Sequence, residues 1–196
     1  MRQVLSFTLE WRCNWKLAIE NFCESYHVFK VHPKTVEPAW PTRTMDILPS
    51  GEGYNLHRRT PAPDADSIRL KNSYFKSLRN VDKGQYVNLA CLFPAHAMSI
   101  KEGMVAWICP RPVDVDCTRV QVGCAMLDED GQAHTEEAIA AIERRLTTFI
   151  GEDQAIVESV QRGLRSGALP NAHCTAWERP NRDFQRYLAH RILGTG

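Results

Sequence analysis

The sequence predicts an α+β fold in which an antiparallel β-sheet carries helices on one side. Several strand patterns follow one another over residues 44–59 and 85–127, and this succession favours antiparallel pairing. Helical periodicity is confined to a segment near the N-terminus and to the residues after 135. A length of 196 residues suffices for one well-buried domain and is short for two, so we predict a single domain over residues 1–196.

The composition is that of an ordinary globular protein and excludes several classes of partner. Hydrophobic residues make up 43% and charged residues 24% of the chain, and the formal net charge is +1. This charge gives no basis for binding nucleic acid or an anionic membrane. No run approaches the ~20 apolar residues of a membrane-spanning helix, and charges interrupt the N-terminus where a signal peptide has an apolar core. We therefore expect a cytoplasmic protein whose seven scattered cysteines are free thiols.

The first third of the chain combines a strand, a helix and a hairpin. Residues 3–11 alternate between apolar and polar types, which predicts a strand. Apolar positions recur at helical intervals in residues 14–33, so we expect most of this segment to be one helix. After a proline-rich stretch, residues 44–48 and 54–59 predict a hairpin, because turn-forming residues separate them. Residues 60–84 are the least regular part of the sequence.

The remaining chain predicts the rest of the sheet and then two helical segments. Strands are expected over residues 85–93, 97–101, 104–110 and 118–127. From Thr135 the apolar spacing becomes helical, with a break or kink at Gly151 and an end at Gly163 and Gly167. A last helix begins near Asn181. We expect its inner face to carry Phe184, Tyr187, Leu188 and Ile192.

Two histidines near the end of the first helix are candidate metal ligands. On a continuous helix, His27 and His32 would lie about 140° apart, too far round to bind one ion. Because Pro33 disfavours helical dihedral angles at His32, the helix should unwind there and let the two imidazoles meet. Two imidazoles and one carboxylate with open coordination positions form the site of non-haem Fe(II) oxygenases. From the residues alone, a hydrogen-bonded histidine pair without metal remains the alternative.

The residues around this pair carry a family resemblance. The order NWK, ENF and E-x-Y-H-x4-H in residues 14–32 resembles the iron-binding signature of Rieske non-haem iron oxygenase α subunits, the aromatic-ring-hydroxylating dioxygenases and their relatives. Gly151-Glu152-Asp153, followed by residues 160–164, looks like the third-ligand helix of the same C-terminal catalytic domain. The resemblance covers nearly the whole chain. It implies a helix-grip (START-like) fold, with long helices packed on one face of an antiparallel sheet.

The resemblance also implies a set of site residues. His27, His32 and Asp153 match the family's mononuclear Fe(II) ligands, with Glu152 as the rival for the third ligand. Glu24 matches a carboxylate that orients the metal-bound histidine and bridges to a cluster on a neighbouring subunit. Asn21 matches an asparagine beside the iron. The alternatives without a site role are that Glu24 is a solvated glutamate and that the Asn21 amide caps local backbone. We expect no ligand role for the other histidines, His57, His96, His134, His173 and His190.

The electron-transfer cofactor of the family has no counterpart in this sequence. A Rieske [2Fe-2S] cluster needs C-x-H followed by C-x2-H, and neither motif is present. We therefore expect the N-terminal Rieske domain to be absent, either because the sequence is part of a longer chain or because electrons come from another protein. A Rieske protein, ferredoxin or reductase would then be the donor. The family's assembly implies a homotrimer.

The resemblance implies an enzyme that activates O2 at Fe(II) to hydroxylate or demethylate a small organic substrate. Glu24, where many ring dioxygenases carry aspartate, slightly favours a quaternary ammonium substrate over an aromatic ring. Two alternatives stay open. One is a non-catalytic helix-grip domain that binds a small molecule, and the other is a fragment that is inactive without a Rieske partner. The iron content of the purified protein distinguishes an oxygenase from the binding domain. Peroxide-driven turnover distinguishes it from the inactive fragment.

Overall fold

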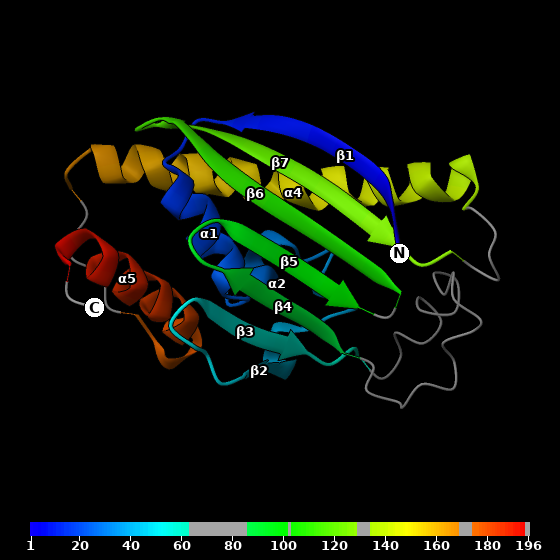
Figure 1. Cartoon of the computed structure of the whole chain (residues 1–196), viewed down its shortest axis with the longest axis horizontal. Helices are drawn as coiled ribbons and strands as arrows, with labels where there is room; N and C mark the ends of the chain where they lie inside the picture. The colour runs from blue at the N-terminus through cyan, green and yellow to red at the C-terminus, as the bar shows by residue number, and fades with distance from the viewer. Residues whose placement is uncertain (63–85, 102, 129–133, 169–173, 195–196) are drawn as a thin grey trace.

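The protein is organised around one seven-stranded antiparallel sheet with helices on one of its faces (Figure 1). The computed structural model describes residues 1–62, 86–101, 103–128, 134–168 and 174–194. The strand order is β1-β7-β6-β5-β4-β3-β2, so β2 to β7 follow one another in space as they do in the chain. The predicted α+β class and helix-grip arrangement are confirmed.

The first strand lies at one edge of the sheet and pairs with the last strand. β1 (Arg2–Trp11) pairs along its length with β7 (Cys117–Met126), and Trp11 lies opposite Thr118. The remaining strands are β2 (Met45–Ile47), β3 (Tyr54–Arg59), β4 (Val87–Leu92), β5 (His96–Lys101) and β6 (Met104–Asp114). Each pairs with its neighbour in antiparallel register, including the hairpin of β2 and β3. The predicted strands are therefore confirmed to within a few residues at their ends.

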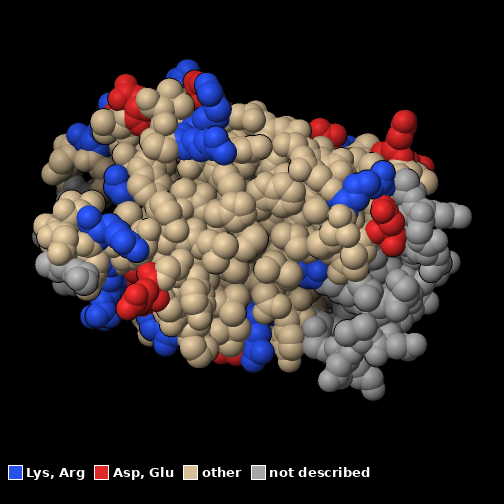
Figure 2. All heavy atoms as spheres, in the orientation of Figure 1, with Lys and Arg blue, Asp and Glu red and all other residues tan. Residues whose placement is uncertain are grey.

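The outer face of the sheet is apolar at its centre. Ala97 and Ile108 are buried beneath the helices, so the alternation of side chains places Met98 and Trp107 on the opposite face. Charged side chains lie around the edges of this face (Figure 2). The Trp107 ring lies directly over Gly123 on β7, where an added Cβ would come within 2.2 Å of Cζ2 of the ring. A glycine is therefore required at this position for the ring to lie flat on the sheet.

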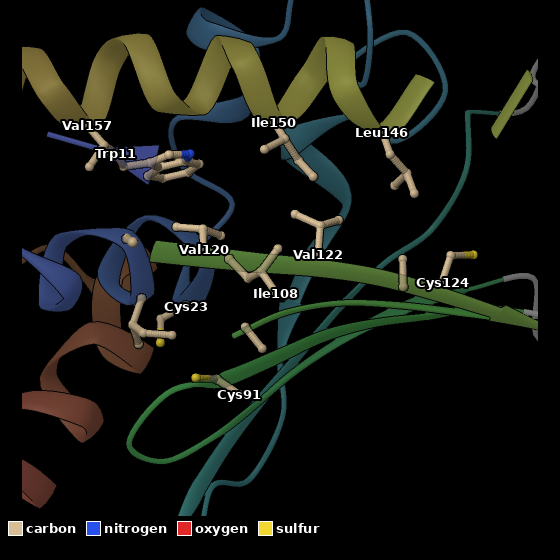
Figure 3. Close-up of a cluster of buried hydrophobic side chains, with 14 of the residues drawn as sticks. Trp11, Cys23, Cys91, Ile108, Val120, Val122, Cys124, Leu146, Ile150 and Val157 are labelled. Atoms are coloured by element: carbon tan, nitrogen blue, oxygen red, sulfur yellow. The ribbon is translucent and has the colours of Figure 1, made fainter. Parts of the chain in front are cut away.

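The core lies between the inner face of the sheet and the long helix α4 (Glu136–Arg165) (Figure 3). Ile142, Leu146, Ile150 and Val157 recur at helical spacing and are buried in this core, and the last three point toward β7 in Figure 3. The helix is continuous through Gly151, so the predicted break at that residue is wrong. A glycine in a helix costs about 1 kcal/mol relative to alanine. The burial of Ile150 and Val157 on either side outweighs that cost.

Helix α5 (Arg179–Leu193) covers one end of the core, where Phe184 is buried and Leu188 is partly buried. Phe184 is fully buried and contacts the rings of Trp15 and Phe93, with centroid distances of 6.0 and 5.4 Å. The predicted inner position of Ile192 is wrong, because this side chain is 78% exposed. Leu193, the last residue of the helix, is also exposed.

We expect Phe184→Ala to destabilise the protein by about 3–5 kcal/mol, the usual cost of removing a buried phenylalanine ring. The reason is the cavity left between α5 and the rings of Trp15 and Phe93. Urea unfolding followed by circular dichroism measures the change. Ile192→Ala on the same helix is the matched control and should stay within about 0.5 kcal/mol of the wild type. Equal effects of the two substitutions would show that α5 is not anchored by Phe184.

The irregular segment expected at residues 60–84 lies almost entirely outside the described residues, which resume at 86. Among the helices that the structure describes, none combines the length and the apolarity needed to cross a bilayer.

Candidate metal centre

The segment that carries both histidines is two helices, where the sequence predicted mostly one. Helix α1 (Trp15–Cys23) ends at Glu24, which has extended dihedral angles (φ −126°, ψ 162°). A single helical turn, α2 (Val28–Val31), follows, with His27 immediately before it and His32 immediately after it. At its start, α1 is capped by Asn14, whose side chain accepts a hydrogen bond from the Lys16 amide at 3.1 Å.

The Glu24 carboxylate explains the break between the two helices. Its Oε2 accepts hydrogen bonds from the backbone amides of Tyr26 and His27. These bonds satisfy amides at the start of the next turn, so the side chain competes with continuation of α1. Its Oε1 lies 2.6 Å from Nδ1 of His27. The predicted contact between Glu24 and His27 therefore exists, but it is made across a helix break and not along one helical face.

The two imidazoles converge on one carboxylate from α4. Their ring centroids are 5.4 Å apart, and His32 has left the helical region (φ −116°, ψ 43°), as predicted from Pro33. Asp153 Oδ1 lies 2.9 Å from Nε2 of His32 and 3.4 Å from Nε2 of His27. One possible ligand atom from each of the three residues lies within 4.8 Å of the others. The structure thus brings together three side chains that are far apart in the sequence.

Asp153 reaches this position because it belongs to the buried face of α4. It follows Ile150 by three residues and precedes Val157 by four, and both of these side chains are buried. Its side chain is 15% exposed and His32 is 2% exposed, so solvent has little access to the pair. Phe149 packs edge-on against the His32 ring at a centroid distance of 6.3 Å.

Further polar side chains hold the three candidate ligands in place. Asn21 Nδ2 donates to Asp153 Oδ1 at 2.9 Å, so its amide does not serve as a local backbone cap. Glu152, the rival third ligand, lies 2.7 Å from Nδ1 of His32, on the side of the ring away from Asp153. Thr35 Oγ1 donates to the same Glu152 carboxylate at 2.6 Å. Each imidazole therefore has one carboxylate at Nδ1 and shares Asp153 at Nε2.

Within the described residues, this is the one cluster of three or more His, Cys, Asp or Glu side chains that could hold a metal ion. His57, His96, His134 and His190 are not part of this cluster. His173 lies outside the described residues. All seven cysteines are free thiols, also as predicted.

A comparison with protein families identifies the domain. The family model described as ring hydroxylating alpha subunit (catalytic domain) matches residues 1–194. The chain belongs to this family. Membership in the ring-hydroxylating α-subunit family agrees with the resemblance seen in the sequence around His27 and His32.

Relatives of this chain include the carnitine monooxygenase oxygenase subunit of Escherichia coli K12. It is 25% identical over 162 residues, which cover 82% of this chain and 40% of the relative. Among solved structures, the quaternary ammonium Rieske monooxygenase CntA in complex with an inhibitor superposes with a TM-score of 0.74 at 20% identity, covering 97% of this chain and 49% of that one. Dicamba monooxygenase bound to dicamba gives 0.63 at 13% identity, covering 98% and 60%. The chain spans about two fifths of the length of the curated relatives it matches.

The ionisable groups of His27, His32 and Asp153 are tightly paired, and this pairing shifts their pKa values. Burial lowers the pKa of His27, but hydrogen bonds to Asp153 and Glu24 outweigh it and raise the pKa to about 9. The pKa of His32 is raised against burial by Asp153 and Glu152. Burial raises the pKa of Asp153, and its bonds to both histidines lower it to about 2. Without metal, the negative charge of Asp153 is balanced by protons on the imidazoles.

A buried histidine behind the cluster gives a pH-dependent prediction. Burial, together with the charges of Arg59 and His27, lowers the pKa of His57 from 6.5 to about 3. The folded protein keeps this imidazole neutral, whereas the unfolded chain takes up a proton below pH 6.5. Its contribution to stability is therefore complete above pH 6.5 and is lost as the pH falls toward 3. We expect the metal-free protein to lose about 2 kcal/mol from this group between pH 6.5 and 5.

Urea unfolding at the two pH values tests this prediction. His57→Gln should lack that part of the pH dependence, because its amide does not titrate. His96→Gln, which changes a half-buried histidine on β5, should keep it. A His57→Gln protein with the full wild-type pH dependence would contradict the assignment.

Sequence reasoning missed some of the residues that support the cluster. Glu152 was considered only as a ligand, and its hydrogen bond to His32 Nδ1 was not foreseen. Thr35 and the contact between Ser25 and His57 were also missed. No local pattern marks these residues, because each contact depends on how α2, α4 and β3 are placed relative to one another. The alternation in β3 does place His57 on the inner face, between buried Asn55 and Arg59.

Proposed function

We propose that this chain is the catalytic domain of a Rieske-type non-haem iron oxygenase and that His27, His32 and Asp153 bind one Fe(II). The observation that carries the proposal is the convergence of two imidazoles and one carboxylate, with ligand atoms within 4.8 Å of one another, in a member of the ring-hydroxylating α-subunit family. A ferrous ion held by two histidines and one carboxylate keeps coordination positions open for O2, and so supplies oxygen activation.

The donor set fits such an ion. Both imidazoles present Nε2 to Asp153, while Nδ1 of each faces a second carboxylate, Glu24 or Glu152. This is the usual arrangement of metal-binding histidines, in which one ring nitrogen binds the ion and the other donates to an acceptor. A passive binding cavity has no need of this arrangement. The fit therefore favours the oxygenase over a non-catalytic helix-grip domain.

The surrounding residues have distinct roles in this proposal. Glu24 accepts the Nδ1–H of His27, and Glu152 accepts that of His32, so each holds its imidazole in the tautomer that exposes Nε2. Asn21 donates to Asp153 Oδ1 and restricts rotation of that carboxylate. These contacts pre-organise the ligands before any ion binds, which lowers the entropy cost of binding.

We further propose that electrons reach the site from a [2Fe-2S] cluster on another subunit, through Glu24. This carboxylate already bonds the His27 ring and lies at the break between α1 and α2, where it is 9% exposed. The solved structure of one quaternary ammonium Rieske monooxygenase was described as giving insight into inter-subunit electron transfer. A homotrimer would place a neighbouring cluster beside each iron. The donor would be a Rieske protein or domain, served by a ferredoxin or reductase.

The substrate that we propose is a small quaternary ammonium compound. Two solved structures of CntA hold γ-butyrobetaine and L-carnitine, and the curated relative is a carnitine monooxygenase subunit. A small aromatic acid is the second candidate, because dicamba monooxygenase shares the fold. The free cysteines suit a reducing compartment, so we place the protein in the cytoplasm.

Peroxide-driven turnover tests the activity without an electron donor. The protein is loaded with Fe(II) under argon and mixed with hydrogen peroxide and either γ-butyrobetaine or benzoate. The balanced reaction inserts one oxygen from peroxide into a C–H bond and releases water, so mass spectrometry with 18O-labelled peroxide follows the label into product. We expect label in the quaternary ammonium product, and none with His32→Ala. Binding of γ-butyrobetaine without iron uptake or label would favour the passive binding domain instead.

A further inference from the structure

The inner face of β3 carries a row of buried polar side chains directly behind the candidate ligand segment. Asn55, His57 and Arg59 alternate along the strand and are 1%, 1% and 6% exposed. Asn55 Nδ2 donates to Cys23 Sγ and to the Pro180 carbonyl, at 3.3 and 2.9 Å. Arg59 Nη1 donates to the Trp40 carbonyl at 3.1 Å. Asn55 and Arg59 therefore bond chain segments that surround the candidate site.

His57 makes the contact nearest to the candidate ligands. Its Nε2 lies 2.8 Å from Oγ of Ser25, and both side chains are 1% exposed. Ser25 lies in the break between the two helices, next to Glu24 and two residues before His27. Its carbonyl accepts a hydrogen bond from the Val28 amide at 3.2 Å. Ser25 thus links the sheet, through His57, to the turn that contains Glu24 and His27.

Packing alone does not explain a histidine at position 57. Its second ring nitrogen, Nδ1, is buried and has no hydrogen-bond partner in the described structure. A buried polar atom without a partner costs stability, and an apolar side chain would avoid that cost. The neutral imidazole and the serine hydroxyl can each donate or accept, so their contact is satisfied in either tautomer. The hydrogen bond between His57 and Ser25 therefore accounts for a histidine at this position.

We propose that His57 is a positioning residue for the metal centre: through Ser25 it fixes the turn that aims Glu24 and the His27 imidazole at Asp153. The register of β3 with β4 sets where His57 lies, because His57 is paired with Leu89 inside the sheet. Loss of the contact frees Ser25 within the break, and the turn then samples orientations in which His27 Nε2 points away from Asp153. This inference rests on the proposed function, since it concerns affinity for the ion.

Cobalt binding by the metal-free protein tests the proposal without any turnover. Co(II) is titrated into wild type, His57→Leu, His57→Gln and Ser25→Ala, and visible absorption reports both affinity and ligand geometry. We expect His57→Leu and Ser25→Ala to weaken Co(II) binding about tenfold, the lower end of the range for partners of metal ligands. His57→Gln should stay within about threefold, because its amide reaches Ser25. The double variant His57→Leu/Ser25→Ala should bind as weakly as either single variant.

Matched controls separate positioning from general stability. Met126→Ala removes a fully buried side chain at the end of β7, beside Arg2 and Met104, and should lower the urea midpoint without changing Co(II) affinity. Wild-type affinity in His57→Leu, or additive losses in the double variant, would overturn the proposal. Loss of Co(II) affinity in Met126→Ala equal to that in His57→Leu would also overturn it. A wild-type protein that binds no Co(II) would overturn the proposed metal centre as well.

Discussion

Asp153→Asn is expected to lower Fe(II) affinity by more than about 100-fold, the largest loss expected from any single conservative change in the chain. Asparagine keeps the shape of the side chain and can still accept a hydrogen bond from Asn21, so the fold should be retained. What is lost is the negative charge between the two imidazoles, whose Nε2 atoms lie 2.9 and 3.4 Å from Asp153 Oδ1. An anaerobic competition titration against a chromogenic chelator measures the affinity.

Glu152→Gln is the matched control, because it decides between the two carboxylates that the sequence left as rivals. Glu152 contacts His32 at Nδ1, on the side of the ring away from Asp153. Loss of the Glu152 negative charge should weaken Fe(II) binding by about 10-fold at most, because this carboxylate only orients the His32 imidazole. If Glu152→Gln abolished binding while Asp153→Asn retained it, the third ligand would be Glu152 and the proposed centre would be wrong.

Glu24→Gln should produce the second large effect, a loss of about 100-fold in donor-driven turnover with iron still bound. The glutamine carbonyl can still accept from the Tyr26 and His27 amides, so the break between α1 and α2 should be preserved. The negative charge beside His27 Nδ1, at 2.6 Å in the wild type, is removed. Stopped-flow oxidation of a dithionite-reduced Rieske protein, with the Fe(II)-loaded domain in excess, measures the electron-transfer step.

Peroxide-driven turnover is the internal control for this variant. Peroxide needs no electron donor, so Glu24→Gln should form labelled product within about threefold of the wild type if its iron content is unchanged. Equal losses in the donor-driven and the peroxide-driven reactions would show that Glu24 only orients His27. Its proposed role as the electron bridge would then be wrong. Glu20→Gln, on α1 and bonded to Gln185, should leave both reactions unchanged.

The residues of the candidate site were predicted from the sequence more accurately than the helix boundaries around them. The spacing of His27, His32 and Pro33 correctly predicted that the two imidazoles converge, because a non-helical residue before proline redirects the second ring. The partner carboxylate at Asp153 came only from the family resemblance. No periodicity in the sequence could show that α4 would lie against α2, since that contact depends on packing between segments far apart in the chain.

The errors have identifiable physical causes. Glutamate is a good helix former, so nothing in residues 14–33 signalled that Glu24 would instead bond the amides of Tyr26 and His27 and end α1. Gly151 suggested a break by its low helix propensity, but the burial of residues on both sides keeps α4 continuous. Ile192 fits the periodicity of α5, yet it lies in the last turn of the helix and is 78% exposed. In each case tertiary context decided against local preference.

The central claim is that one iron binds between α2 and α4. Anomalous diffraction at the iron absorption edge, from crystals of the Fe(II)-loaded protein, tests it most directly. We expect a single peak per chain, bound by Nε2 of His27, Nε2 of His32 and a carboxylate oxygen of Asp153. A peak on Glu152 in place of Asp153, or imidazoles turned apart with no peak between them, would contradict it.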